Sequence, residues 1–400
     1  MHKNKVIITG MGMISSIGKT VEENFASLIA NQSGLSDLTL FSSIHQGKFK
    51  VGEVKMSNED LVKQLNLPKD NNFTRTALLG LYAAKQAIEN ADIQSITAHR
   101  TGLISSTTVG GMDFIEKYCQ DFETNSAARK YISTQEAGDS TTKIADHLGI
   151  EDFTTTLSTA CSSAANAMIL GARMIQSGRL DRVIVGGTDA LAKFTINGFH
   201  SLMILTEGLN APFDQNRQGL NLGEAAAYLV LEREDLALKE NKKCWGTLSG
   251  YGNANDAFHQ TASSENGEGA YLAMKKALEK ANLSPNAIDY INAHGTATPN
   301  NDLSEGRALE RIFKNTPVFS STKPFTGHTL AAAGSVEAIF SLLALENNVI
   351  FANLNYQTPM EALTITPQTT LLQKNLQHVM SNSFGFGGNC TALIFSKYPS

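Results

Sequence analysis

One cysteine stands where the chain could form a nucleophile. Cys161 follows the strand-like run Thr154–Thr159 and opens a helical pattern rich in small residues. Backbone N–H groups at a helix start lower the pKa of a thiol from about 8.5 and favour the thiolate. We therefore expect Cys161 to be reactive, with a buried structural cysteine as the alternative. That structural role is our expectation for Cys119, Cys244 and Cys390.

Two of the nine histidines lie at matching positions. His294 ends the apolar strand Asp289–Ala293 and opens a tight loop, and His328 lies just before a second small-residue helix, five residues after Lys323. Because α/β sheets place their active sites at strand ends, we expect both rings to face Cys161. A nucleophilic thiol with two imidazoles is suited to acyl transfer.

The elements that must position these side chains are short β-rich runs that alternate with longer helical patterns. Such alternation is typical of βα units with buried, largely parallel sheets. The predicted strands are Val6–Thr9, Thr101–Ser105, Arg182–Val185, Ala226–Leu231, Ile288–Ala293, Val318–Ser321 and Ala392–Phe395, and the predicted helices are Val21–Ala30, Ala77–Asn90, Ser140–Leu148, Cys161–Gln176, Gly269–Ala281, Asp302–Phe313 and Thr329–Glu346.

Two segments share one design and suggest an internal duplication. Thr154–Ser177 and Val318–Glu346 each run from a strand through a turn into a helix of small residues, which can pack closely on all sides. Chance similarity between two alanine-rich helices is the alternative. If the repeat is real, the charged stretch 232–243 is the natural boundary between two halves, although it could equally be a solvated helix.

A glycine pair near the N-terminus resembles part of a dinucleotide-binding motif. Gly10-Met-Gly12 follows a strand, but the third glycine and a well-placed acidic residue are missing. We expect a tight strand-to-loop turn here and no NAD.

Composition limits the partners. The 400 residues are 42% hydrophobic and carry a net charge of −5, so no global positive field attracts nucleic acid or an anionic membrane. The start Met1–Lys5 is polar and the apolar run after it is too short for an export signal. The four cysteines are widely spaced, which argues against disulfides and structural zinc. We expect a reduced, cytoplasmic protein without metal.

At these residues the sequence resembles the β-ketoacyl-acyl-carrier-protein synthases, the elongating condensing enzymes of fatty-acid and type II polyketide synthesis. Four motifs arrive in the order found in that family: Ser158-Thr-Ala-Cys161-Ser-Ser, Ala293-His-Gly-Thr-Ala-Thr-Pro299, Ser321-Thr-Lys-Pro-Phe-Thr-Gly-His328 and Asn382-Ser-Phe-Gly-Phe-Gly-Gly388. The resemblance implies an α/β thiolase fold, with two duplicated βαβαβαββ halves in a five-layer αβαβα arrangement. We place the halves at 1–240, with the nucleophile, and 241–400, with both histidines.

The resemblance also implies a reaction, the decarboxylative Claisen condensation of malonyl-carrier with an acyl chain held on Cys161. His294 and His328 would stabilise the enolate, Lys323 would sit behind His328 and hold it neutral, and Glu337 would hydrogen-bond nearby. The remaining implied roles are an oxyanion hole from the N–H groups of Cys161 and Phe386, a gate at Phe386, contacts of Thr296 and Thr298 to the pantetheine arm, and an acyl pocket at Val109 and Phe199.

Three departures from the family pattern concern loops and docking. Gln218 and Ala225 replace an acid and a glycine in a loop that gates the site, and Pro299-Asn-Asn-Asp302 replaces Pro-Ala-Gly-Asp. Asn71 and Asn72 stand where the family often has basic residues that dock the acidic carrier, and the basic residues that are left are Arg75, Arg129 and Lys130. We expect Arg129 and Lys130 to bind the acyl carrier protein, with solvated surface charge as the alternative.

Related readings remain open. The resemblance implies a homodimer that needs no cofactor beyond the carrier's phosphopantetheine. A type II polyketide or polyene ketosynthase paired with a chain-length factor is the main alternative, and the loop departures favour it slightly. A thiolase acting on acyl-CoA would need a second cysteine near Phe384–Phe386, and Cys390 lies too late. An inactive chain-length factor would typically lack Cys161.

Overall fold

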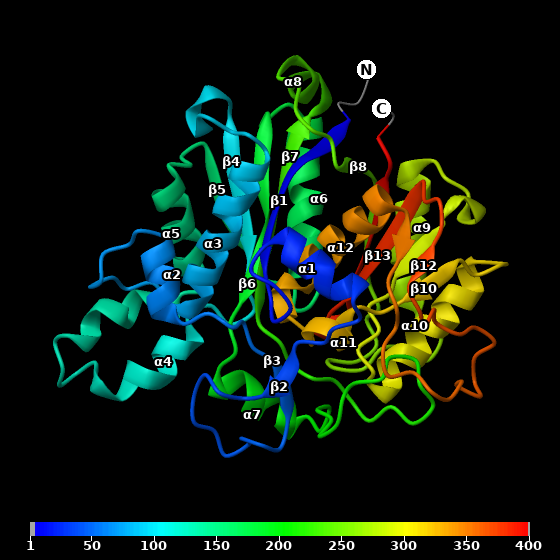
Figure 1. Ribbon diagram of the computed structural model, residues 1–400, viewed down its shortest axis with the longest axis horizontal. Helices are drawn as coiled ribbons and strands as arrows, with labels where there is room; N and C mark the ends of the chain where they lie inside the picture. The colour runs from blue at the N-terminus through cyan, green and yellow to red at the C-terminus, as the bar shows by residue number, and fades with distance from the viewer. Residues whose placement is uncertain (1–4, 399–400) are drawn as a thin grey trace.

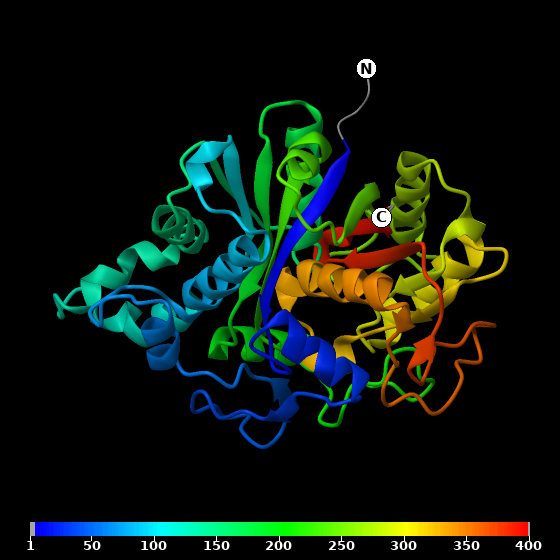
Figure 2. The ribbon, with the colours of Figure 1, turned by 45° about the horizontal axis from the view of Figure 1, so that its top comes forward.

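The computed structural model describes residues 5–398, and residues 1–4 of the polar start therefore lie outside the described part. Its main feature is a ten-stranded sheet in the order β10-β9-β13-β14-β8-β1-β7-β6-β4-β5. Figures 1 and 2 show β4 and β5 on one side of the molecule, β10 and β13 on the other, and the helix 333–347 between them. The strands are β1 (Val6–Ile14), β4 (Thr101–Ser106), β5 (Phe153–Leu157), β6 (Arg182–Asp189), β7 (Ala225–Arg233), β8 (Gly246–Asn255), β9 (Tyr290–Asn292), β10 (Val318–Ser320), β13 (His378–Phe384) and β14 (Asn389–Ser396).

The sheet consists of two five-stranded parts with the same topology. The order β5-β4-β6-β7-β1 in one part corresponds to β10-β9-β13-β14-β8 in the other. In each part three strands run parallel and the last two pairings are antiparallel. The parts meet through a short pairing of β1 with β8, in which Ile7 lies opposite Thr247. The predicted duplication is confirmed, and the division at residue 240 stays a prediction.

Helices occupy the same places in both halves. The first half has α3 (Arg75–Asn90), α5 (Asp139–Leu148) and α6 (Ser163–Gln176), and the second has α9 (Glu268–Ala281), α10 (Pro299–Ile312) and α12 (Ala333–Asn347). α3 and α5 contact the first part of the sheet, and α9 contacts the second and packs on α10. α6 and α12 contact each other between the two parts, and this completes five layers (Figure 1).

The central helices are built from small residues, as predicted. A side chain at Gly334 of α12 would press on the backbone nitrogen of Ala165 in α6 at 2.7 Å. Every residue from Ala333 to Leu345 is buried. Within the described residues, Leu330–Asn347 is the one helical stretch apolar and long enough to cross a membrane, but 89% of it is buried in the protein. It is a core helix.

The predicted turn at Gly10 and Gly12 is wrong, because both glycines lie inside β1. A Cβ atom on Gly12 would come closer than 3.0 Å to the carbonyl oxygen of Ala83 in α3. Gly252 of β8 faces the carbonyl oxygen of Ala273 in α9 in the same way. The glycines let a helix approach the first strand of each half.

The predictions missed β8, β13 and several short elements, which are β2 (Leu35–Asp37), β3 (Lys50–Gly52), α2 (Asn58–Gln64), α4 (Met112–Tyr118), α7 (Lys193–Ser201), α11 (Lys323–Thr326), β11 (Val349–Ile350) and β12 (Leu372–Gln373). The predicted helix Val21–Ala30 is confirmed as α1 (Val21–Ile29), and α8 (Glu234–Lys239) fits the alternative of a helix in the charged stretch. Figure 1 shows β2, β3 and α7 at the lower edge of the molecule and α8 at the top.

Candidate active site

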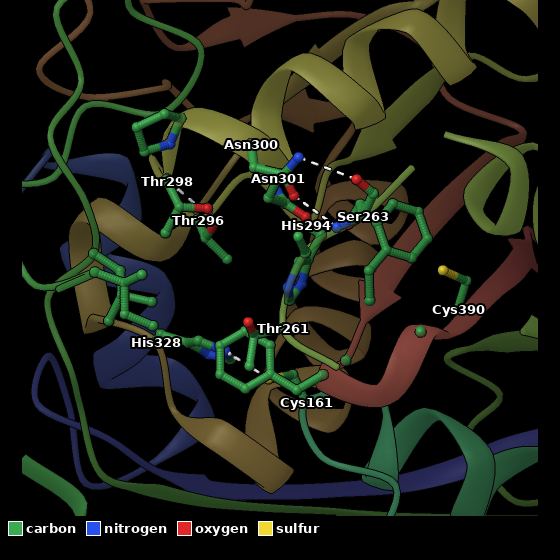
Figure 3. Close-up of a pocket in the computed structure, with 18 of the residues that line it drawn as sticks. Cys161, Thr261, Ser263, His294, Thr296, Thr298, Asn300, Asn301, His328 and Cys390 are labelled. Atoms are coloured by element: carbon green, nitrogen blue, oxygen red, sulfur yellow. Dashed lines mark hydrogen bonds between the residues drawn. The ribbon is translucent and has the colours of Figure 1, made fainter. Parts of the chain in front are cut away.

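Three strand ends bring the predicted residues together in one cavity. Cys161 follows β5, His294 follows β9, and His328 follows β10 through the short α11. One sulfur and two ring nitrogens lie within 4.8 Å of one another, and all three residues are buried. They line a cavity of about 200 Å³, which Figure 3 shows with both rings directed toward Cys161.

Strained backbone accompanies each of these side chains. Ala160, just before Cys161, has a φ of +52°, and Leu330, two residues after His328, has a φ of +55°. Ala297, three residues after His294, has a φ of +67°. Side chains other than glycine rarely adopt such angles, and they persist where the surrounding structure imposes them. The turns therefore fix where the reactive groups point.

The thiol of Cys161 departs from the predicted behaviour. The helix α6 begins at Ser163, two residues later than predicted, so the sulfur lies before the helix rather than in its first turn. Burial raises the pKa of Cys161 to about 11, while the charge of Lys323 and the N–H groups of Phe386 and Cys161 oppose that rise. The predicted lowering of the pKa is wrong, because removal from water outweighs these favourable groups.

His328 lies against the sulfur. Its Nε2 is 2.9 Å from Sγ of Cys161, and its Nδ1 accepts the N–H of Leu330 at 3.3 Å. A neutral imidazole that accepts at Nδ1 carries its proton on Nε2. Burial, followed by the charge of Lys323, holds the pKa of His328 well below its usual range. The ring is therefore neutral and directs an N–H toward the reaction centre.

Lys323 lies beside His294, which corrects its predicted place behind His328. Its Nζ is 3.3 Å from Nδ1 of His294 and also donates to Glu337. Burial, then Lys323 and His328, hold the pKa of His294 well below its usual range, so this ring is neutral too. Burial raises the pKa of Glu337 to about 7, and Lys323 opposes that rise. With a lysine on Nδ1, His294 keeps its proton on Nε2.

The same protonation pattern bears on metal binding. By distance, Cys161, His294 and His328 could hold a metal ion such as zinc. A metal needs an unprotonated ring nitrogen, but each Nδ1 already accepts a hydrogen bond. The two imidazole rings are therefore better suited to donate N–H groups into the cavity than to bind a metal ion.

Buried carboxylates that the sequence analysis missed hold the loop after β9. Glu305 accepts the N–H groups of His294 and Gly295, at 2.9 and 2.8 Å. Burial raises the pKa of Glu305 to about 7 against these hydrogen bonds. Asp302 accepts the N–H of Ala297 at 3.1 Å. The sequence did contain a signal for both residues, because an acidic side chain on the buried face of a predicted helix is unusual unless it has a partner.

A third missed carboxylate connects the two halves. Asp189, at the end of β6, accepts hydrogen bonds from Thr107 and Thr108 and from the N–H of Ala331, which follows His328. Its signal in the sequence was an acid that follows the apolar run Val183–Val185 after Gly-Gly-Thr. The three carboxylates fix the backbone around both histidines.

Polar and aromatic side chains form the cavity wall. The hydroxyl groups of Thr296 and Thr298 lie 2.9 Å apart, and both residues line the cavity. Phe386 and Phe199 also line it, with nearly parallel rings whose centroids are 5.9 Å apart. Val109 is half-buried after β4 and is not among the lining residues, so its place in an acyl pocket stays a prediction.

The basic residues considered for carrier docking already have hydrogen-bond or ion-pair partners within the protein. Arg75, the third basic residue left in this region, is buried and paired with Glu224, so it does not add to the basic surface. Arg129 is exposed and donates to two nearby backbone carbonyls. Lys130 is exposed and pairs with Asp70.

Comparison with known proteins places this site in a family. The chain matches "Beta-ketoacyl synthase, N-terminal domain" over residues 3–237 and "Beta-ketoacyl synthase, C-terminal domain" over residues 245–357. It is 32% identical to 3-oxoacyl-acyl-carrier-protein synthase 2 of Vibrio cholerae over 417 residues, covering 99% of this chain and 100% of the relative.

Solved structures are similar over the same length. The ishigamide ketosynthase/chain length factor aligns with a TM-score of 0.92 and 29% identity, covering 99% of this chain and 100% of that one. The ketosynthase ApeO of Xenorhabdus doucetiae, solved with its chain length factor ApeC, aligns with a TM-score of 0.87 and 33% identity, covering 99% and 98%. With its duplicated fold and its cavity of one cysteine and two neutral histidines, the chain belongs to the β-ketoacyl synthase family of condensing enzymes.

Proposed function

We propose that this protein is a 3-oxoacyl-acyl-carrier-protein synthase, which condenses malonyl-carrier with an acyl chain held on Cys161. The observation that carries the proposal is the buried cavity where the sulfur meets two neutral imidazoles, each with its Nδ1 occupied. The name of the Vibrio cholerae relative supports the substrate class. No cofactor is needed beyond the phosphopantetheine that carries both substrates.

The first half-reaction loads the enzyme. The sulfur of Cys161 attacks the thioester carbonyl of acyl-carrier, and the carrier thiol leaves with the proton that the Cys161 thiol gives up. The backbone N–H groups of Cys161 and Phe386 hydrogen-bond to the sulfur, and they would stabilise the oxyanion of the tetrahedral intermediate. Because the pKa of the thiol is about 11, we attribute the acceleration of this step to the oxyanion hole rather than to a preformed thiolate.

The second half-reaction forms the carbon–carbon bond. Malonyl-carrier loses carbon dioxide, and the electron pair of the broken bond forms an enolate whose oxygen accepts N–H groups from His294 and His328. The enolate carbon attacks the thioester on Cys161, and the cysteine sulfur leaves as a thiolate that takes up one proton from water. Neutral rings suit this step, since an imidazolium would protonate the carbanion. Lys323 would hold the proton of His294 on Nε2.

The surroundings of the cavity supply further roles. Thr296 and Thr298 would contact the pantetheine arm, and Phe386 would act as a gate that admits malonyl-carrier after acylation. Phe199, stacked on Phe386, would border the acyl chain. We further propose an acyl carrier protein as partner, a homodimer and a cytoplasmic location.

A specialised pathway is the second candidate. Two of the similar structures are ketosynthases with chain length factors, at 29% and 33% identity. This supports a type II polyketide or polyene ketosynthase that pairs with a chain-length factor. Native mass spectrometry after co-expression with candidate partners distinguishes a homodimer from a heterodimer.

Two substitutions of the nucleophile test the reaction. Cys161→Ser should abolish the acyl-enzyme, observed as a mass increase after incubation with a panel of acyl-carriers. Cys161→Gln should still release carbon dioxide from malonyl-carrier without condensation, because both histidines remain. Normal condensation by Cys161→Ser, or the loss of both activities in Cys161→Gln, would contradict the proposed site.

A further inference from the structure

The segment that carries the gate residue is held by one neighbouring loop. Gly387 donates its N–H to the carbonyl of Gln260 at 2.7 Å, and Asp256 donates its N–H to the carbonyl of Gly388 at 2.8 Å. Gly387 and Gly388 have φ angles of +79° and +82°, which glycine adopts without strain. The segment Gly385–Gly388 is thus an unstrained glycine turn that is hydrogen-bonded to the loop 256–267 between β8 and α9.

One face of α10 holds this loop in turn. Residues at helical spacing along α10 each reach one of four successive loop residues, 263–266, so the loop follows a rigid helix. The contacts beyond the cavity are Ser304 Oγ to the carbonyl of Ser264 at 2.8 Å, Arg307 Nη1 to the carbonyl of Glu265 at 3.2 Å, and Arg311 Nη1 to the carbonyl of Asn266 at 2.6 Å.

Asn300 makes the contact at the cavity itself. Its Oδ1 accepts the N–H of Ser263 at 2.6 Å, and its Nδ2 donates to the carbonyl of Ser263 at 3.1 Å (Figure 3). Both residues line the cavity that contains Cys161. The reciprocal pair fixes one peptide unit on each side of Ser263. Alanine, expected at this position from the family pattern, has no group that could form it.

We propose that Asn300 is a positioning residue that controls how readily the gate segment opens over Cys161. The path is short, because Ser263 is three residues from Gln260, which accepts the N–H of Gly387 next to Phe386. When the pair to Asn300 is lost, the loop moves more freely at its cavity end, and the gate leaves its closed position more often. The inference rests on the proposed role of Phe386 as a gate.

Alkylation of Cys161 by iodoacetamide tests this without any substrate. The exposed Cys119 serves as an internal reference, and peptide mass spectrometry gives the ratio of the two rates in each variant. Asn300→Ala should raise the ratio about three- to tenfold, as the loss of two net hydrogen bonds allows. Asn300→Asp keeps the acceptor for Ser263 and loses the donor, so its ratio should be intermediate. Asn315→Ala, an exposed asparagine beyond the end of α10, should match the unmodified protein.

The outcomes separate this inference from the proposed reaction. An unchanged ratio in Asn300→Ala would overturn the inference, and so would an equal rise in Asn315→Ala. A raised ratio in both Asn300 variants, in the expected order, supports it. Since the assay uses no carrier protein, a protein that fails to condense substrates would contradict the proposed function and leave the alkylation result intact.

Discussion

At the scale of single residues, the site is defined by which nitrogen of each imidazole is already occupied. Leu330 donates to Nδ1 of His328, and Lys323 lies on Nδ1 of His294. Burial holds the pKa of both rings well below the usual range. Two N–H groups therefore converge near the sulfur, which suits an enolate oxygen.

Lys323 has a structural role and a positioning role that mutation can separate. Lys323→Met leaves the buried carboxylate of Glu337 without its cation, which should cost about 3–5 kcal/mol of folding free energy. The double variant Lys323→Met/Glu337→Leu removes both charges and should recover most of that stability. Neither variant restores a donor to His294, so malonyl decarboxylation should stay low in both. Urea unfolding and carbon dioxide release are the measurements; full decarboxylation by the double variant would contradict the positioning role.

The pKa of Cys161 predicts a pH dependence with a definite sign. The thiolate is the reactive form, so with a pKa of about 11 its fraction at lower pH is small and grows with pH. Alkylation by iodoacetamide should accelerate about tenfold per pH unit from pH ~6 to pH ~10, whereas a small free thiol levels off above about 8.5. Both histidines are neutral over this range, so they add no inflection. A plateau below pH ~8 would instead indicate the lowered pKa expected from a helix start.

At the scale of elements, the glycines of β1 and β8 set the distance between strand and helix. Gly12→Ala and Gly252→Ala each place a methyl group against a helix carbonyl, of Ala83 and Ala273, and should lose about 1–3 kcal/mol of stability. Gly198→Ala in α7 meets no atom within 4 Å and should be neutral or stabilising by up to about 1 kcal/mol. Chemical denaturation checks all three variants; equal midpoints would show that the two glycines do not set the packing.

The same glycines explain why one strand was missed. β8 reads Gly-Thr-Leu-Ser-Gly-Tyr-Gly-Asn-Ala-Asn, in which glycine and asparagine are typical of turns. The actual role of Gly250 and Gly252 is close approach to α9, a helix that begins thirteen residues after the end of β8. β13 carries the buried polar residues Ser381, Asn382 and Ser383, so it lacked the apolar pattern of a strand. The local sequence pattern predicted the apolar strands. It failed for β8 and β13, where contacts with elements distant in sequence determine which residue types are present.

The candidate site was predictable in its members and not in its geometry. Turns after strand-like segments indicated Cys161, His294 and His328, and the cavity confirms that they meet. The family resemblance implied that Lys323 serves His328, but the short helix α11 directs it to His294 instead. The depth of burial that raises the pKa of Cys161 likewise depends on the whole fold.

At the scale of the whole molecule, the site belongs to both halves at once. The first half supplies Cys161 and the second supplies both histidines, and the buried Asp189 connects them through the N–H of Ala331. α6 and α12, which follow the cysteine and His328, pack against each other in the middle layer. The duplicated architecture therefore places two equivalent strand-to-helix turns face to face, one with the nucleophile and one with a hydrogen-bond donor.

The net charge of −5 sets the last prediction, which concerns the acidic carrier protein. Arg129 and Lys130 are the proposed docking residues, but Asp70 neutralises Lys130 on a molecule that is negative overall. Asp70→Asn should therefore strengthen carrier binding about two- to fivefold at low salt, the range expected for an exposed charge pair. Replacing both basic residues by glutamate should weaken it.

The matched control is Asp235→Asn, which removes the same charge from an exposed aspartate that pairs with the half-buried Arg233. It changes the net charge equally, so any difference from Asp70→Asn reports the local patch rather than overall repulsion. Binding to fluorescent acyl carrier protein should be measured from low to high salt, because the Debye length falls from about 30 Å at ~0.01 M to about 3 Å at ~1 M and a surface effect weakens with it. If the two asparagine variants bind equally, docking does not use Lys130, and the carrier must approach another part of the surface.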